Sequence, residues 1–400
     1  MTHVKYSTLL LLALVGRCGL GLTAGLSVLY LTQVIGLPVA AVGITLTAAA
    51  AVAVVGSIWL GHLADRLGAR EVFAAMAGLQ ALATAGTLLV HDLAAYAVVA
   101  LTLALADLGY RSAYGAVVFA VVEPAERLPI RAKARVASNV GFAGGAGLAG
   151  LALASGAPMA YRIGLIGSAL LIAAAGLLTF RLPRVARVHS RAAGPWAVLR
   201  DRPFVSFVGL DGVLNIHNSM IKVGIPLWMV TRTDAPHWLV SVMLIVNSAV
   251  VIVFQVRLSR GTDHLAGAAR AGRRSGLLLS LACVILACTT QTSAALTIAL
   301  LLAATLFHVV GEILESASGW GISFALAPPG QVGQYQGAQA MGRGLGDLIG
   351  PVLITTVALP LGPLGWLLTA AFFALAALLI PVVLRPAQGA ATHELAAARL

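Results

Sequence analysis

Long apolar runs constrain the fold of this chain more than any other feature. The sequence holds twelve of them, and each is long enough to cross about 30 Å of hydrocarbon as a helix. A soluble protein is about a quarter charged, whereas this chain is 10% charged and 60% hydrophobic. Strands of an outer-membrane barrel are about half as long and alternate apolar with polar residues, which these runs do not. The sequence therefore predicts an all-α integral membrane protein whose solvent is the lipid bilayer.

The twelve predicted transmembrane helices form two six-helix bundles, because a long polar, basic stretch follows the sixth. We place the helices at residues 8–31, 39–60, 71–90, 94–122, 133–155, 160–180, 203–230, 237–258, 275–290, 294–316, 333–358 and 363–384. The predicted parts are an N-terminal bundle at 1–182, a cytoplasmic linker at 183–202, a C-terminal bundle at 203–384 and a cytoplasmic tail at 385–400. Two bundles of six helices each indicate internal duplication, and duplicated transporters have their substrate site between the bundles, near the bilayer midplane.

The basic residues are distributed unevenly between the two ends of the predicted helices. Twenty of the 26 lysines and arginines fall in loops or tails on one side, and only Arg162 and Arg232 fall at the opposite ends. Cytoplasmic loops carry such an excess of positive charge, so we predict that both termini are cytoplasmic. The net charge of +12 is therefore a topology signal, and we expect no nucleic-acid partner.

Ionisable and polar residues inside the predicted helices are the candidate functional residues. A charge facing lipid at a helix centre costs about 2.5–3.5 kcal/mol, so these side chains line a wet cavity or pair with one another. Their spacing places Asp107 with Arg111, and Arg343 with Asp347, on shared helix faces four residues apart. The candidate cavity residues are Arg17, Asp107, Arg111, Asp211, Asn215, Asn218, Lys222, His308, Glu312 and Glu315.

Each cluster has a structural alternative. Asp107 and Arg111 either take part in transport or lock two helices together. Glu312 and Glu315 either bind a proton or substrate, or they form hydrogen bonds between helices. The first role is physically reasonable because a carboxylate in surroundings of low polarity holds a proton more readily. His308 with these two glutamates could ligate a metal, but no second histidine motif supports this. We therefore predict no metal and no cofactor.

Small residues predict close helix packing in two of the spans. We assign this role to Asn139, Gly141 and Gly145 in the fifth span and to Arg343, Asp347, Gly350 and Pro351 in the eleventh. Trp228, Trp238 and Trp366 fall near outer helix ends, where an interfacial aromatic belt is expected.

The loop after the second span carries a specific motif. Residues 61–70 read GHLADRLGAR, with Gly61, Asp65, Arg66, Gly68 and Arg70 in the pattern G-x-x-x-D-R-x-G-x-R. This loop resembles the signature loop of the major facilitator superfamily, and helix number, loop charge and the linker extend the resemblance over the whole chain. RSAYG at 111–115 is similar to the R-x-x-x-G motif of the family's bacterial proton-coupled drug exporters, whereas GFAGGAGLAG in the fifth span lacks their G-P step.

The resemblance implies roles for individual residues. The first, fourth, seventh and tenth spans would line the central cavity, and Arg111 would be linked to proton transfer. Asp65 would act as a cytoplasmic gate by capping the helix that begins near Gly333, and the alternative is a surface ion pair with Arg66 or Arg70. The family also implies a monomer in the bacterial cytoplasmic (inner) membrane.

The sequence thus predicts a secondary active transporter rather than an enzyme. We expect proton-coupled efflux of amphipathic small molecules or antibiotics by alternating access, with a carboxylate at Asp107, Asp211, Glu312 or Glu315 carrying the proton. The alternative is a proton symporter or facilitator that imports a small polar or anionic nutrient, with Arg17, Arg111 and Lys222 as anion partners. No Walker-type phosphate loop is present, so ATP is not the direct energy source. Substrate, direction and the choice between protons and sodium stay open.

Overall fold

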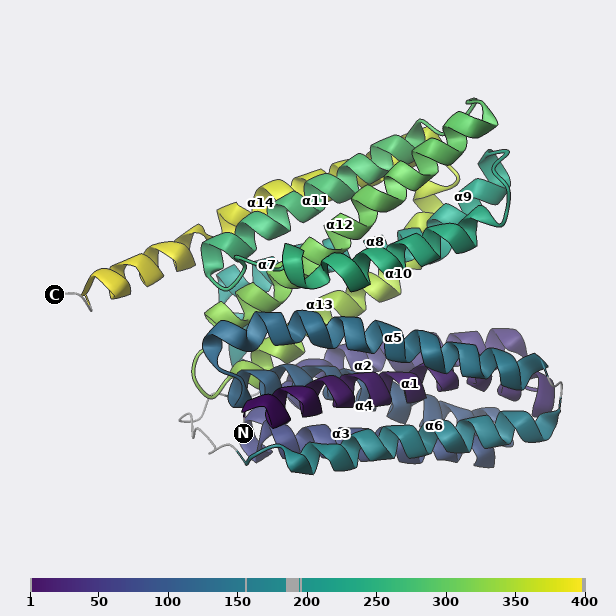
Figure 1. Ribbon diagram of the computed structural model, residues 1–400, viewed down its shortest axis with the longest axis horizontal. Coiled ribbons are helices and arrows are strands. Elements are labelled where there is room, and N and C mark those ends of the chain that lie inside the picture. Colours follow the sequence, from purple (N-terminus) through teal and green to yellow (C-terminus); the bar gives the residue numbers. More distant parts are fainter. Residues whose placement is uncertain (1, 155–156, 185–193, 195, 398–400) are drawn as a thin grey trace. The chain divides into compact units, whose positions relative to one another are not determined.

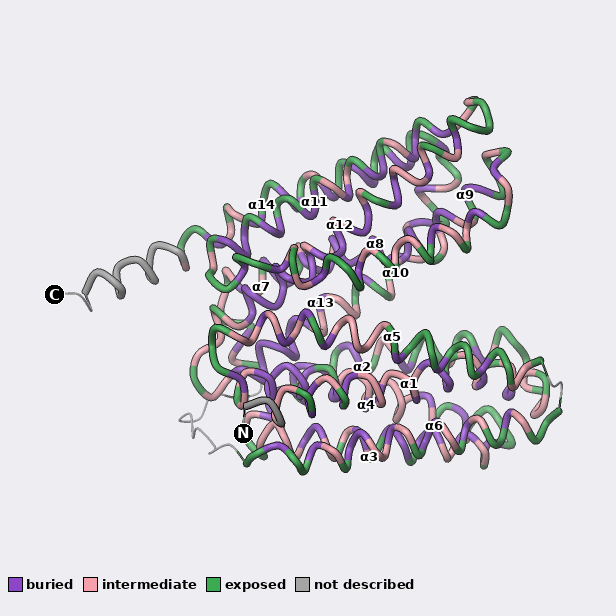
Figure 2. The backbone as a smooth tube through the Cα atoms, viewed as in Figure 1, coloured by how far each residue is buried: buried purple, intermediate pink, exposed green. Residues whose placement is uncertain are grey.

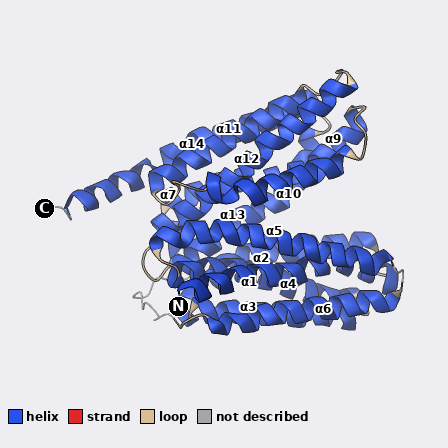
Figure 3. Ribbon diagram, viewed as in Figure 1, coloured by secondary structure: helices blue, strands red, loops and turns tan. Residues whose placement is uncertain are grey.

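The computed structural model describes residues 2–154, 157–184, 194 and 196–397, and every regular element in these ranges is a helix (Figure 3). The all-α prediction is confirmed. Residues 185–193 and 195 of the predicted linker, and 398–400 of the predicted tail, lie outside the described residues. Chain contacts divide the protein into two compact units, each described below by itself.

Unit 1 comprises residues Met1–Trp196 and Ala327–Met341. Its six long helices, side by side in Figure 1, are α1 (Thr2–Leu29), α2 (Val39–Leu67), α3 (Ala69–Gly86), α4 (Leu93–Val121), α5 (Arg127–Ala154) and α6 (Pro158–Leu178). Helix α1 packs against α5 and α6, while α4 packs against α2 and α3. Each helix corresponds to one predicted span.

One hydrophobic core cluster of unit 1 includes buried residues of α1, α3 and α4. The rings of Phe73 and Tyr110 lie 4.3 Å apart, and Tyr114 packs on the same phenylalanine. Both tyrosine hydroxyls donate to backbone carbonyls of α1, that of Tyr110 to Leu12 at 3.4 Å and that of Tyr114 to Leu9 at 3.2 Å. The aromatic bodies are therefore buried while their polar ends are satisfied, which fixes α1 against α4.

Unit 2 comprises Ala197–Leu326 and Gly342–Leu400. Its helices are α7 (Arg202–Asn215), α8 (His217–Ser219), α9 (Ile225–Arg232), α10 (Leu239–Leu258), α11 (Leu265–Ala287), α12 (Ala294–Leu326) and α14 (Pro363–Ala397). Helix α11 packs against α12 and α14, while α14 also packs against α7. Helix α13 (Val332–Leu353) is continuous, but its residues up to Met341 belong to unit 1 and the rest belong to unit 2.

The predicted seventh span is a distorted helix. A π-helical segment, Met220–Gly224, separates α8 from α9, and the N–H of Ile225 donates to the carbonyl of Met220 five residues back. Pro226, in the first turn of α9, has no N–H and therefore cannot donate to the carbonyl of Lys222. The proline thus explains why the regular hydrogen-bond pattern is interrupted here.

Nine helical stretches within the described ranges are long and apolar enough to cross a membrane. The other three predicted spans are helical too, but the seventh is broken, α11 carries Arg270, Arg273 and Arg274, and the first half of α13 is polar. Helix α14 continues to Ala397, so the described part of the predicted tail is helical. Buried and exposed residues alternate along the helices (Figure 2), and many exposed ones are large and apolar, as lipid-facing surfaces require.

The tryptophans differ from the prediction of an interfacial belt. Trp228 and Trp366 have 0% exposed surface, and their rings pack edge to face at 5.8 Å. The indole N–H of Trp228 donates to the Thr289 hydroxyl at 2.7 Å. The prediction was wrong for these two residues, because position along a helix does not say whether a side chain faces lipid or the bundle. Trp238 is 60% exposed, as a belt residue would be.

Glycines allow two helix pairs to approach closely. A Cβ added at Gly141 or Gly145 of α5 would collide with backbone oxygens of α1, and one added at Gly350 of α13 would collide with the hydroxyl of Ser219. These contacts match the packing role predicted for the three glycines. Pro351, also assigned to packing, lies inside α13, three residues before the start of the π-helical segment Ile354–Ala358.

Candidate functional site

In unit 1, one carboxylate binds two arginines. Asp107 and Arg111, both on α4, form the predicted i,i+4 ion pair, with 2.6 Å between Oδ2 and Nη2. Arg17 of α1 joins them, with 3.7 Å between its Nη1 and Oδ1 of Asp107. The sequence placed these residues in a common cavity but did not pair Arg17 with Asp107. The group carries an excess of one positive charge when all three side chains are ionised.

In unit 2, one guanidinium binds two buried carboxylates. Arg343 donates from Nε to Asp211 at 3.0 Å and from Nη2 to Glu315 at 2.6 Å. Asp211 is 1% exposed and Glu315 is 2% exposed. Buried charges require partners, and these geometries provide them. Helices α7, α12 and α13 are thereby joined by one ionic cluster.

A third carboxylate adjoins this cluster through an amide. The side-chain N–H groups of Asn215 donate to the Arg343 carbonyl and to Oδ1 of Asp347, both at 2.9 Å. Asn218 donates in turn to Oδ1 of Asn215 at 3.0 Å. The sequence assigned Arg343 and Asp347 together to helix packing, but the described ion pairs of Arg343 go to Asp211 and Glu315 instead. A long guanidinium can reach other helices, so spacing along one helix does not fix its partner.

Lys222 and Glu312, also in the predicted cavity set, lie in other surroundings. The spacing of Asp211, Asn215, Asn218 and Lys222 at i, i+4, i+7 and i+11 predicts one polar helix face. Lys222 is exposed and belongs to the π-helical segment, so it does not continue that face. Glu312 accepts a hydrogen bond from Asn247 of α10 at 2.9 Å, although it is only three residues from Glu315. The two glutamates of α12 therefore serve different groups.

A histidine that the sequence reasoning missed lies beside His308. His217 of α8 is 1% exposed, and His308 of α12 is 0% exposed. Nε2 of His308 lies 3.0 Å from the carbonyl oxygen of His217 and 3.2 Å from its Nδ1. The available signal was a second histidine within a predicted span, but His217 lies off the polar face predicted from Asp211, so helix spacing did not select it.

The signature loop contacts the start of α13, within unit 1. Oδ1 of Asp65 accepts from the N–H of Gly333 at 2.6 Å, and Oδ2 accepts from the N–H of Gln334 at 2.9 Å. These N–H groups belong to the first helical turn and have no partners within the helix, so a carboxylate there completes the helix terminus. The predicted cap is present, whereas gating stays a prediction.

The other loop residues have separate roles. Gly68 ends α2 at φ +102°, a conformation that favours glycine. Gly61 allows the approach of α13, because an added Cβ would collide with the carbonyl oxygen of Gly333. Arg70 binds Glu71 at 3.1 Å and the Leu182 carbonyl at 2.9 Å rather than Asp65.

Three further side chains hold the first two turns of α13. His62, which the sequence treats as a loop residue, is buried, and its Nδ1 lies 2.6 Å from the side-chain nitrogen of Gln334. Hydroxyls of Ser112 and Ser57 donate to the carbonyls of Gly333 and Gly337, at 3.2 and 3.0 Å. The start of α13 is thus bound through both donors and acceptors.

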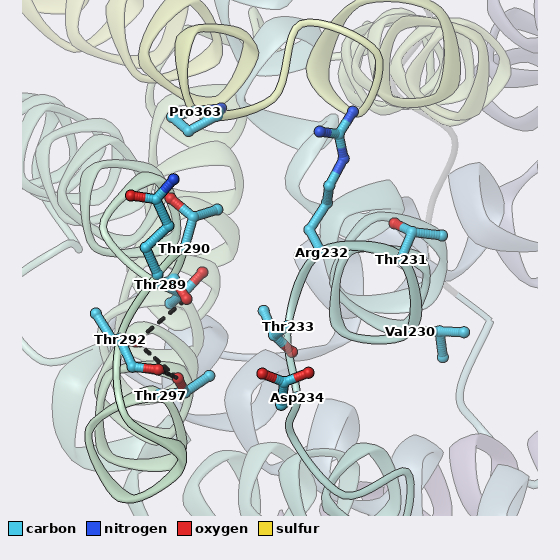
Figure 4. A pocket seen from close by; sticks show the side chains of 11 residues that line it. Val230, Thr231, Arg232, Thr233, Asp234, Thr289, Thr290, Thr292, Thr297 and Pro363 are labelled. Atoms are coloured by element: carbon cyan, nitrogen blue, oxygen red, sulfur yellow. Dashed lines mark hydrogen bonds between the residues drawn. The ribbon is translucent and has the colours of Figure 1, made fainter.

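Unit 2 also contains a pocket of about 560 Å³ (Figure 4). Thr289, Thr292 and Thr297 lie along one side, and Arg232 lies opposite them, with Asp234 nearby. Hydroxyls of Thr292 and Thr297 are 2.7 Å apart. The pocket is at the loop ends predicted to face outward, and its lining includes none of the ionic cluster.

Comparisons with known proteins agree with this architecture. The family model described as Major Facilitator Superfamily matches residues 9–351. No protein of curated function matches the chain by sequence. Among solved structures, the human organic anion transporter MFSD10 (TETRAN) has TM-score 0.68 and 17% identity, covering 94% of this chain and 99% of that one.

Two other solved structures have the same fold. A bacterial homologue of the iron transporter ferroportin, in an outward-facing state, has TM-score 0.76 and 14% identity, covering 95% of this chain and 98% of that one. The proton:xylose symporter XylE has TM-score 0.71 and 11% identity, covering 95% and 96%. Identities this low carry the fold alone. The family model spans most of the sequence, and the chain therefore belongs to the Major Facilitator Superfamily, whose members are membrane transporters.

Proposed function

We propose that this chain is a proton-coupled antiporter that exports amphipathic small molecules by alternating access. The observation that carries the proposal is the ionic cluster of unit 2, where Asp211 and Glu315 bind the guanidinium of Arg343 and Asp347 adjoins them through Asn215. With all four groups ionised, the cluster has two negative charges in excess. Excess charge in surroundings of low polarity is unfavourable, and binding a proton relieves it.

The cluster also suggests how proton and substrate exchange. Protonation of Asp211 or Glu315 removes one of the two ion pairs of Arg343, which changes how strongly α7 and α12 are held to α13. A cationic amphiphile is attracted by the same negative excess and competes with the proton. The choice of export over import rests on the resemblance of RSAYG at 111–115, which contains Arg111, to the motif of the proton-coupled drug exporters.

An importer of a small organic anion is the second candidate. The observation that favours it is the pair of guanidinium groups, Arg17 and Arg111, that both bind the carboxylate of Asp107 in unit 1. Guanidinium groups bind carboxylates and phosphates well, so an anionic substrate suits this position. The human structural neighbour is named as an organic anion transporter, and the fold likeness is compatible with either substrate class.

A vesicle assay tests the proposal. Everted membrane vesicles are energised to form a pH gradient, and ethidium is added as an amphipathic cation while the gradient is followed with a fluorescent probe. We expect ethidium to collapse the gradient with the unaltered protein and much less with Asp211→Asn or Glu315→Gln. Glu123→Gln is the matched control, because Glu123 is exposed outside the long helices.

The outcomes separate the candidates. Unchanged coupling in both cluster variants, at equal membrane levels, would contradict the assignment of the proton site. No response to amphipathic cations, together with proton entry driven by an organic anion in right-side-out vesicles, would replace export by the importer.

A further inference from the structure

Unit 2 contains a compact cluster of three side chains of the kinds that bind metals, namely His217, His308 and Glu312. One ligating atom from each residue lies within 4.8 Å of those from the other two. Their exposed fractions are 1%, 0% and 8%. The sequence discounted a metal at His308 for want of a second histidine, and the fold supplies that histidine from α8.

The hydrogen bonding of His308 is incomplete. A carbonyl oxygen only accepts, so a proton on Nε2 of His308 satisfies the contact with the His217 carbonyl. Nδ1 of His308 is then a bare lone pair, and it has no hydrogen-bond partner in the described part of the chain. Buried lone pairs are normally filled. His308 therefore has a nitrogen free to bind a further ligand within a buried group.

The carboxylate of the group is already oriented. The side-chain amide of Asn247, on α10, donates to Oε2 of Glu312 at 2.9 Å. Carboxylates that bind metals are commonly held by such a hydrogen bond, which fixes their direction. Helices α8, α10 and α12 thus contribute to one site, and none of its three ligands binds Arg343 in the described ion pairs.

We propose that His217, His308 and Glu312 bind one divalent transition-metal cation. Two imidazoles and one carboxylate are a donor set of zinc and its borderline neighbours, whereas magnesium and calcium prefer oxygen alone. Because the ligands are almost fully enclosed, the ion is a resident one that ties α8, next to the π-helical segment, to α12. The proposal is independent of the transported substrate.

Cobalt titration of the purified full chain tests this site. The protein is stripped of metal in detergent, and Co²⁺ is added while the visible d–d absorption bands are recorded. We expect one Co²⁺ per chain, displaced by one equivalent of Zn²⁺. His217→Ala and His308→Ala should each weaken binding by more than about tenfold, since even the loss of a supporting partner costs about 10- to 100-fold in affinity.

The controls use histidines and an amide. His91→Ala and His264→Ala remove exposed histidines and should leave the titration unchanged. Asn247→Leu should weaken binding without removing a ligand, so it tests the site if a histidine variant fails to fold. No d–d bands in the unaltered protein would overturn the proposal. Equal affinity in the folded variants and the controls would overturn it too.

Discussion

Removing the charge of Asp65 should release the first turn of α13. Its two carboxylate oxygens accept backbone N–H groups of Gly333 and Gln334, at 2.6 and 2.9 Å. In Asp65→Asn one oxygen becomes an amide NH₂, which cannot accept, so one of these N–H groups loses its partner. A hydrogen bond to a charged group contributes about 1.5–3 kcal/mol. Local opening of this turn should therefore become about 10- to 150-fold more frequent.

Amide hydrogen exchange measures this opening directly. With the protein in nanodiscs, the amides of Gly333 and Gln334 are followed by mass spectrometry with fragmentation to single residues. Exchange that proceeds through local opening reports the free energy of that opening. We expect Asp65→Asn to exchange faster than the unaltered protein at both amides, and Asp65→Ala, which loses both acceptors, to exchange faster still.

A matched control comes from another helix terminus. Asp92 precedes α4 and accepts from the N–H of Ala95 at 2.7 Å. Asp92→Ala, which removes this acceptor, should accelerate exchange at Ala95 and leave Gly333 unchanged. If neither Asp65 variant alters exchange at Gly333 or Gln334, the carboxylate does not hold α13, and the gating prediction loses its physical basis.

Two further substitutions probe the ionic and glycine contacts. Arg343→Gln should lower the unfolding temperature in a fluorescence scan, since stranding the buried carboxylates of Asp211 and Glu315 costs about 3–5 kcal/mol. Adding Asp211→Asn and Glu315→Gln should restore much of the loss, and a lack of rescue would show that the charges are not the cause. Gly145→Leu should reduce the yield of monodisperse protein, because a Cβ at this position collides with the α1 backbone. Gly144→Leu is the control, since position 144 faces open space and the yield should not change. Equal yields of the two variants would refute close packing as the reason.

Elements that depend on apolar length could be predicted from the sequence. Each of the helices α1 to α6 corresponds to a predicted span because the bilayer thickness sets its length. The boundary between units could not be predicted, since continuous α13 contributes to both. Composition along one helix does not record which neighbours its two halves pack against.

In the candidate sites, too, some contacts could be predicted from the sequence and others could not. Asp107 and Arg111 could be paired from their spacing because both lie on one undistorted helix. The partners of Arg343 could not, because they come from α7 and α12, and helix spacing contains no information about contacts between helices. His217 was missed for a related reason: its partner His308 is 91 residues away.

The π-helical segment at Met220–Gly224 affects how relatives of this chain are aligned. Such a segment accommodates one more residue per turn than a regular helix, so it is equivalent to a single-residue insertion that leaves both flanks in place. A relative with a regular helix here would need a one-residue gap between Asn215 and Trp228. Without that gap, every position from Ile225 onward in α9 would be compared with a residue about 100° around the helix, and its buried Trp228 would be mistaken for a lipid-facing side chain.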